Sequence, residues 1–387
     1  RWDGNAWSAP RPVHQRPAAW DRAPSLAIAA DGTPWLAWVS TEWDEPGTSG
    51  IYVSRWTGYL WSAPEQVPLG LAMSAKEPAL VSSPDGGLWL AWVGFDVNDD
   101  EIFANQWDGI SWSSPALVSA DDEDPTLYDR QPRLAVGQDG QPWVVWTGHQ
   151  AGPDDEIYAS HWSGTGWTSE TIISRDDNAL DVSPSLALDG EGRPWVAWKG
   201  RVTEGGHSRL RIHVSRWEAS RAAWTAEALA GVPLAQGVDE AGPLLAKGPE
   251  DSMHLAWTVT GAEGSALARS QWQGGRWAEA RLLRVAAPDD AALVPLPHDD
   301  SLELLWLNQA AEAPQPVSRS PIDDTSGSLS AWRATQPQSQ PLQGVDPIPN
   351  RYLAFGDSIT CSPDCFVPDE LLSYPERLDK KLDLRVA

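Results

Sequence analysis

The sequence predicts an all-β protein built from a repeated unit of four short strands. Twenty-five tryptophans stand at regular positions along the 387 residues. Two tryptophan motifs alternate with a period near 50 residues, which indicates a supersecondary unit repeated in space. Residues 1–310 show no helical periodicity, so the apolar runs between turn residues are expected to be strands.

The first motif is an apolar hairpin with a turn before its second strand. Glycine in an Asp-Gly turn accepts the positive φ that tight hairpins need. Runs such as WLAWV are apolar on both faces, which is typical of a strand covered on both sides. The copies are DGTPWLAW (31–38), DGGLWLAW (85–92), DGQPWVVW (139–146) and EGRPWVAW (191–198), followed by the worn copies DSMHLAW (251–257) and DSLELLW (300–306).

The second motif forms a further hairpin in each unit. In the unit 78–118, we expect strands at PALVSS, LWLAWVG, EIFANQW and SWSSPALV. The copies of the motif are RWDGNAW (1–7), RWTGYLW (55–61), QWDGISW (106–112), HWSGTGW (161–167), RWEASRAAW (216–224) and QWQGGRW (271–277).

Four-stranded sheets at this period, without helices, resemble a β-propeller. Six copies of each hairpin predict six blades over residues 1–310, with the hairpin 1–13 closing against 292–307. Seven blades are the alternative, because 317–332 can be a decayed outer hairpin. Residues 311–350, rich in Pro, Gln and Ser, are either a linker or that hairpin.

The repeated W-x-G-x-x-W motif is similar to that of some fucose-binding propellers, which implies stacking of sugars on exposed tryptophans. The alternative is that these tryptophans pack between blades, since they recur in every copy. The acidic runs DDEIF (99–103) and DDEIY (154–158) are either Ca²⁺ ligands or solvated turns. They lack the spacing of a known calcium loop, so we expect no metal and no cofactor.

The charge excludes two classes of partner. The chain has 28 Lys+Arg and 54 Asp+Glu, a net charge of −26. Such a chain repels nucleic acid and anionic membranes. We also expect no membrane insertion, because no apolar run reaches the roughly 18–20 residues of a membrane helix.

Residues 351–387 read as the opening of an α/β domain. An apolar strand runs into GDSIT (356–360), and SYPERLDKKLD (373–383) has the pattern of an amphipathic helix. This block resembles the start of the SGNH (GDSL) hydrolase family. The resemblance implies that Ser358 is the nucleophile and a backbone oxyanion donor, with Gly356 and Asp357 as supporting motif residues. Cys361 and Cys365 are a candidate disulfide, with free thiols as the alternative.

The family's remaining catalytic blocks, which supply Gly, Asn and an Asp-x-x-His, are not found after the motif. Asp251 and His254 have the Asp-x-x-His spacing, but we interpret them as part of a worn repeat. The chain opens inside a repeat without Met, so we expect a processed or missing N-terminus and a longer reading frame.

These observations lead to two functional hypotheses. The first is a fragment of a secreted SGNH-type serine esterase, extracellular or periplasmic, with an accessory propeller. It would hydrolyse esters, acetylated polysaccharides above all, and would be inactive without its downstream Asp and His. The alternative is a non-catalytic propeller that binds carbohydrate or protein.

Overall fold

The computed structural model describes most of the repeat region, and every regular element in it is a β-strand. The described residues form two compact units. The first contains β1–β12, apart from the start of β11, and the second contains β13–β25. The described residues are 12–13, 19–42, 49–72, 74–95, 99–119, 127–149, 154–175, 177, 179–230, 238–248, 252–261, 264–273, 275–283, 288–295, 302–308 and 318–321.

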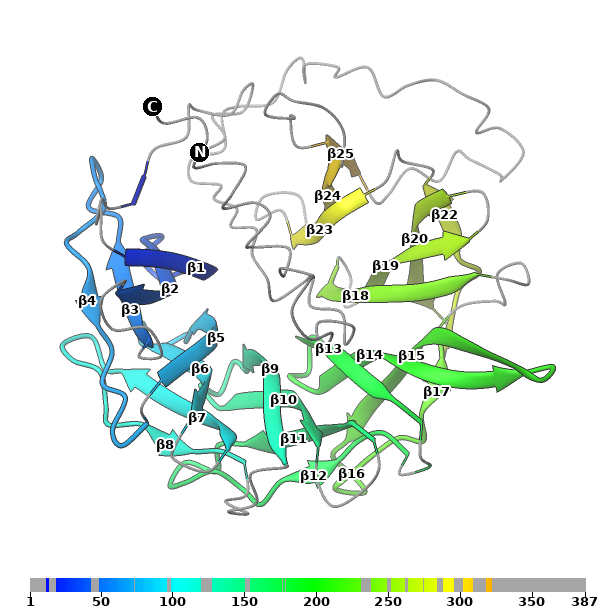
Figure 1. The fold of residues 1–387 in the computed structure, drawn as a ribbon, viewed down its shortest axis with the longest axis horizontal. Helices are drawn as coiled ribbons and strands as arrows, with labels where there is room; N and C mark the ends of the chain where they lie inside the picture. The colour runs from blue at the N-terminus through cyan, green and yellow to red at the C-terminus, as the bar shows by residue number, and fades with distance from the viewer. Residues whose placement is uncertain are drawn as a thin grey trace. The chain divides into compact units, whose positions relative to one another are not determined.

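The first unit holds three consecutive repeats of four antiparallel strands (Figure 1). A single parallel bridge between Asp100 and Tyr128 joins the second and third sheets. The strands are β1 (Ala19–Ile28), β2 (Pro34–Glu42), β3 (Ser49–Arg55) and β4 (Glu65–Gln66); β5 (Ser74–Ser82), β6 (Leu88–Phe95), β7 (Asp100–Trp107) and β8 (Ala116–Leu117); and β9 (Tyr128–Val136), β10 (Pro142–His149), β11 (Glu156–His161) and β12 (Thr171–Ile172).

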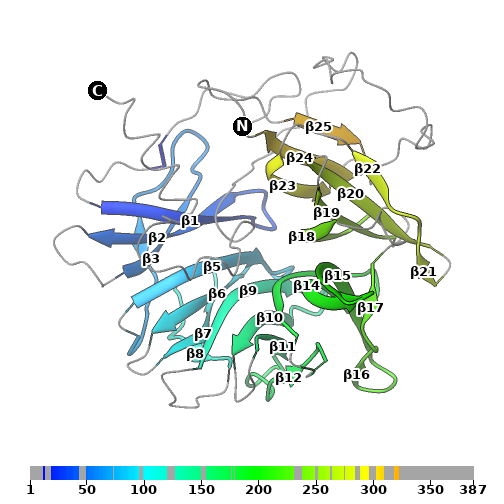
Figure 2. The same ribbon diagram turned by 45° about the vertical axis from the view of Figure 1, so that its right-hand side comes forward.

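The second unit holds two five-stranded sheets and one three-stranded sheet (Figure 2). Its strands are β13 (Asp181–Leu188), β14 (Pro194–Glu204), β15 (His207–Glu218), β16 (Ala223–Trp224) and β17 (Ala228–Leu229); β18 (Asp239–Lys247), β19 (Met253–Gly261), β20 (Gly264–Gln273), β21 (Arg276–Trp277) and β22 (Arg281–Leu283); and β23 (Pro288–Pro295), β24 (Leu302–Asn308) and β25 (Ser318–Pro321).

The strands expected for the unit 78–118 are confirmed as β5–β8, in that order. The motif W-x-G-x-x-W closes each outer hairpin of the first unit through a bridge between its two tryptophans, as between Trp56 and Trp61. In the segment 311–350, β25 pairs with β24 as a third strand. The opening hairpin 1–13 and the block 351–387 lie almost wholly outside the described residues.

A β-bulge recurs in the first strand of five repeats. The register shifts at each site, as between Arg22 and Ser25. The residue just before a proline takes a positive φ at every bulge, and the set is Ala23 (51°), Glu77 (49°), Gln131 (56°), Ser183 (59°) and Gly242 (59°). L-residues rarely adopt this conformation, and an extra residue here bends the strand and increases its twist.

The second tryptophan of the first motif is the centre of each sheet's core. Trp92, Trp146, Trp198 and Trp257 are among the largest fully buried side chains. The indole N–H of this tryptophan donates to a side chain of its own repeat: Trp38 to Asp21 (3.0 Å), Trp92 to Asn105 (2.7 Å), Trp146 to Asp129 (2.9 Å) and Trp198 to Asp181 (2.8 Å). A buried polar group without a partner is costly, and in these four repeats a side chain of the same copy accepts the indole hydrogen bond.

The ring opposite this tryptophan sets the size of a nearby residue. Trp92 stacks on Phe103 with centroids 5.0 Å apart. A Cβ placed on Gly94 would lie 2.6 Å from Cδ2 of Phe103. In the repeat of β18–β22, alanine lies opposite the tryptophan, and Val259 occupies the position of Gly94. The residue opposite the tryptophan and the residue two positions after the tryptophan therefore fill one fixed volume together, as close packing requires.

Candidate functional site

A tight turn between β1 and β2 carries the first polar group of the site. The backbone N–H of Gly32 donates to the carbonyl of Ala29, and Gly32 has a φ of 82°. The carboxylate of Asp31 accepts the backbone N–H of Thr33 at 2.8 Å. Hydrogen bonds from Thr33 lower the pKa of Asp31 below its usual value. Asp31 is exposed, so it presents an ionised acceptor at neutral pH.

Arg55 supplies the opposite charge. It ends β3 directly across from Trp35 on β2, and its guanidinium lies 5.6 Å from the centre of the Trp35 ring. The ring of Trp107, from the next repeat, lies 5.4 Å from that of Trp35 at 54°. Arg55 is exposed, and no carboxylate among the described residues lies within ion-pair distance of it.

These residues line an open pocket of about 850 Å³ between the first two repeats of the first unit. Two loops bring the wall together: the turn 31–34 and the outer hairpin that contains Trp56, which is half-buried. Three turn glycines, Gly58, Gly86 and Gly109, complete the lining. The pocket thus combines an ionised acceptor, a charged donor and aromatic surface, which are groups that can bind a small polar ligand.

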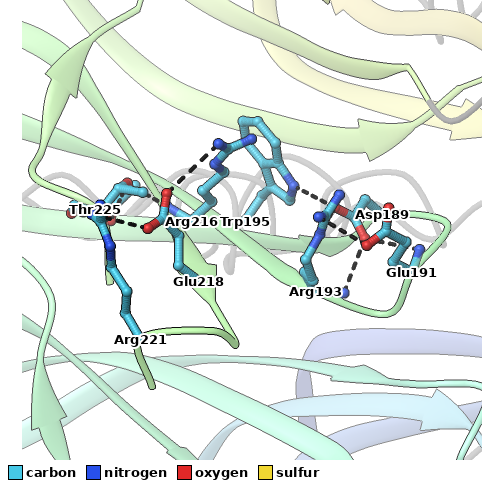
Figure 3. Close-up of polar contacts among 9 residues, drawn as sticks. Asp189, Glu191, Arg193, Trp195, Arg216, Glu218, Arg221 and Thr225 are labelled. Carbon is cyan, nitrogen blue, oxygen red and sulfur yellow. Dashed lines mark hydrogen bonds and ion pairs between the residues drawn. The ribbon is translucent and has the colours of Figure 1, made fainter. Parts of the chain in front are cut away.

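The same constellation occurs in the second unit, with a different outcome. Arg216 lies 5.3 Å from the ring of Trp195 (Figure 3). It also lies 5.5 Å from the ring of Trp272, so it contacts both rings. It also lies 3.8 Å from Glu218, which pairs with Arg221 at 3.2 Å. Arg216 therefore has an acidic neighbour, Glu218, whereas Arg55 has no such neighbour among the described residues.

The turn next to this second constellation is also internally satisfied. Asp189 accepts the indole N–H of Trp195 at 3.1 Å and the Nε–H of Arg193 at 2.8 Å (Figure 3). Burial alone would raise the pKa of Asp189, but these hydrogen bonds hold the pKa below its usual value. In the first unit, the corresponding tryptophan is Trp35, and the structure shows no partner for its indole N–H among the described residues.

Most tryptophans of the two motifs pack against one another. Trp89 lies 5.5 Å from Trp162 and 5.9 Å from Trp167, and Trp195 lies 6.0 Å from Trp277. Trp35 and Trp107 are only 6% and 8% exposed. The interpretation of these residues as packing between repeats is confirmed for this set, and the half-buried Trp56 offers more surface to a ligand.

The acidic runs are buried rather than solvated. Glu101 accepts a hydrogen bond from the hydroxyl of Ser119, and Glu156 accepts one from Ser174 at 2.5 Å. Both glutamates are at most 5% exposed. Within the described part of the chain, no three His, Cys, Asp or Glu side chains are grouped so as to hold a metal ion. These runs therefore anchor the third strand of their repeats.

Burial shifts the pKa of several titratable groups on the strands, and three of these shifts are large. It raises the pKa of Asp129, which is also close to Glu170, to about 8. It raises the pKa of Asp181 to about 9, and it lowers the pKa of His213 to about 4. His213 stacks on Trp198 at 5.7 Å, in the place that Tyr or Phe occupies in the first unit.

The residues predicted as a hydrolase site lie outside the described residues: Gly356, Asp357, Ser358, Cys361 and Cys365. Their roles stay untested predictions. His254 is buried in β19, where it pairs with Ala246 and accepts or donates a hydrogen bond with Ser252. Its interpretation as part of a worn repeat is confirmed. No helix that could cross a membrane occurs in the described segments.

Sequence reasoning missed Asp31 and Arg55. The available signal was the charged residue that precedes the tryptophan in RWTGYLW, together with the Asp-Gly turn one hairpin earlier. Both features recur in other copies, so the sequence alone does not indicate which copy leaves a pocket.

No protein-family model matches the chain, and no curated protein matches it in sequence. Several solved structures share its fold. A protein of unknown function from Dyadobacter fermentans is 14% identical over 80% of this chain and 96% of that chain, with a TM-score of 0.54. The α-L-arabinofuranosidase Arb93A of Fusarium graminearum is 13% identical over 80% and 95%, with a TM-score of 0.53. The polysaccharide lyase Uly1 is 11% identical over 76% of each chain, with a TM-score of 0.53.

At this level of identity the comparisons show the fold alone, an all-β fold resembling β-propellers of carbohydrate-active proteins. They contradict the prediction of an SGNH-type esterase, because nothing among them supports an SGNH hydrolase. The reason lies in the chain itself. The repeats dominate its structure, whereas a Gly-Asp-Ser tripeptide forms turns in many folds.

Proposed function

We propose that this chain is a carbohydrate-binding propeller module of an extracellular or periplasmic protein, with its six sheets as blades. The observation that carries the proposal is the open pocket with the exposed pair Asp31 and Arg55 beside Trp56. A sugar ring presents hydroxyl groups that both donate and accept hydrogen bonds. An ionised carboxylate accepts from one such hydroxyl, and a guanidinium donates to another.

The fold neighbours support the choice of ligand class. One α-L-arabinofuranosidase structure that resembles this chain, at a TM-score of 0.51, is a complex with arabinobiose. The acidic chain would repel polyanions in general, whereas a neutral sugar encounters only the local pair of charges. The alternative is a protein-binding propeller. Binding to a protein surface would not need an acceptor and a donor that line the same pocket, as Asp31 and Arg55 do.

Isothermal titration calorimetry with arabinan, galactan, β-glucan and their soluble oligosaccharides tests the proposal. We expect Arg55→Ala to weaken binding at least about tenfold, since a hydrogen bond to a charged group contributes about 1.5–3 kcal/mol. Arg216→Ala is the matched control, because it removes the same residue type from the closed constellation of the second unit. The absence of binding, or equal losses in both variants, would refute the proposal.

A further inference from the structure

The pocket is large for a single sugar. Its volume is about 850 Å³. Pockets of about 300–1,000 Å³ enclose ligands of drug size, whereas a hexose has only about 12 non-hydrogen atoms. One ring held by Asp31 and Arg55 would therefore leave much of the pocket to a neighbouring ring.

Part of the pocket wall is backbone without side chains. Gly58, Gly86 and Gly109 line it, each with a positive φ of 99°, 92° and 96°. A Cβ added to any of them would meet no atom within 4 Å. Three hairpin turns thus bring backbone to the pocket wall, and no side chain at these three positions blocks a longer ligand.

Large apolar side chains follow directly on two of these glycines. Tyr59 follows Gly58 and is 88% exposed, and Ile110 follows Gly109 and is 86% exposed. Aromatic rings that remain in water next to a pocket are typical recognition surfaces, since they contribute large apolar contact area at small entropic cost. The apolar faces of sugar rings fit such a surface.

We infer that the pocket binds an oligosaccharide of at least two rings, one held by Asp31 and Arg55 and the next stacked on Tyr59. This inference rests on the proposed function. It assigns the minimum length of the ligand and names Tyr59 as the residue that contacts the second ring. Tyr59 is not among the residues that line the pocket, so a single ring held by Asp31 and Arg55 should gain little from it.

A length series tests the inference. Arabinose, galactose and glucose are each titrated as the free sugar, the disaccharide and the trisaccharide into the whole chain. We expect the disaccharide of the recognised sugar to bind about tenfold more tightly than the monosaccharide. Tyr59→Ala should remove most of this gain and change monosaccharide binding less than about twofold, because one stacking contact corresponds to roughly a tenfold change in affinity.

Leu71→Ala is the matched control, since Leu71 is 93% exposed and does not line the pocket. It should leave all affinities unchanged, and circular dichroism should show that both variants keep the wild-type fold. Equal affinity for one ring and two, or an unaltered length dependence in Tyr59→Ala, would overturn the inference and leave the proposed function standing. Failure of every sugar to bind would overturn both, and a protein ligand for the same rim would then have to be sought.

Discussion

Gly94→Val should be strongly destabilising, and a second substitution should rescue it. A Cβ on Gly94 would lie 2.6 Å from Cδ2 of Phe103 and 2.6 Å from Cζ3 of Trp92, far inside ordinary contact distance. Overpacking of a core costs about 1–3 kcal/mol. The added side chain overlaps two rings, so we expect the free energy of unfolding to fall by an amount at the upper end of this range, about 3 kcal/mol.

Phe103→Ala alone should cost about 2 kcal/mol, less than for a fully buried ring, because Phe103 is partly exposed. The double variant reproduces the arrangement of Val259 beside Ala268 in the repeat of β18–β22. We therefore expect it to lose about 2–3 kcal/mol, well below the sum of about 5 kcal/mol. Coupling of this size is typical of residues in contact.

The free energies of unfolding are measured by urea denaturation, with tryptophan fluorescence and circular dichroism as probes. Gly166→Val serves as the control, because a Cβ on Gly166 would meet no atom within 4 Å. It should change stability by less than about 0.5 kcal/mol. Strictly additive losses in the double variant would show that the two positions do not share one volume.

Four further predictions follow from the charges and the bulges. The pKa of Asp181 is about 9 in the folded state and 3.8 in the unfolded state, so the stability of the wild-type protein falls as pH rises from 3.8 towards 9. In urea denaturation, Asp181→Asn should be more stable than wild type at pH 8 and equally stable at pH 4. Asp189 has a lowered pKa and contributes stability above pH 3.8, so Asp189→Asn should instead destabilise at pH 8. Saccharide affinity should be constant in calorimetric titrations from pH 5 to 8, because the pKa of Asp31 is lowered; a fall near pH 6 would exclude this residue as the acceptor. Gly242→Ala should lower the melting temperature, with a loss of about 1 kcal/mol, since it places a Cβ at a φ of 59°.

The sequence predicted the strands well, because turn chemistry and tryptophan spacing act within one repeat. The Asp-Gly turns ending at Gly32 and Gly86 and the bridge between Trp56 and Trp61 all follow from local pattern. The bulges also had a local signal, a proline near the middle of the first strand in these five repeats, which sequence reasoning passed over.

The pocket could not be predicted from the sequence, because it depends on contacts between repeats. Trp35 meets Trp107 only because two sheets pack with a particular stagger. The tryptophan motifs do not differ in a way that separates the open position of Arg55 from the closed position of Arg216. The esterase prediction failed for a related reason: a short motif was given more weight than the fold around it.

The indole hydrogen bonds described for four repeats have a consequence for the history of the chain. Each of them begins and ends inside one copy, so duplication or deletion of a whole copy leaves none of these four indoles without its acceptor. The second copy illustrates the freedom this gives. Alanine stands at position 75, where the neighbouring copies have aspartate, and Asn105 of the same copy accepts the hydrogen bond from the indole N–H of Trp92 instead. Ancestral copies could thus diverge one at a time, each repairing its own interior, while the pocket side chains were free to specialise.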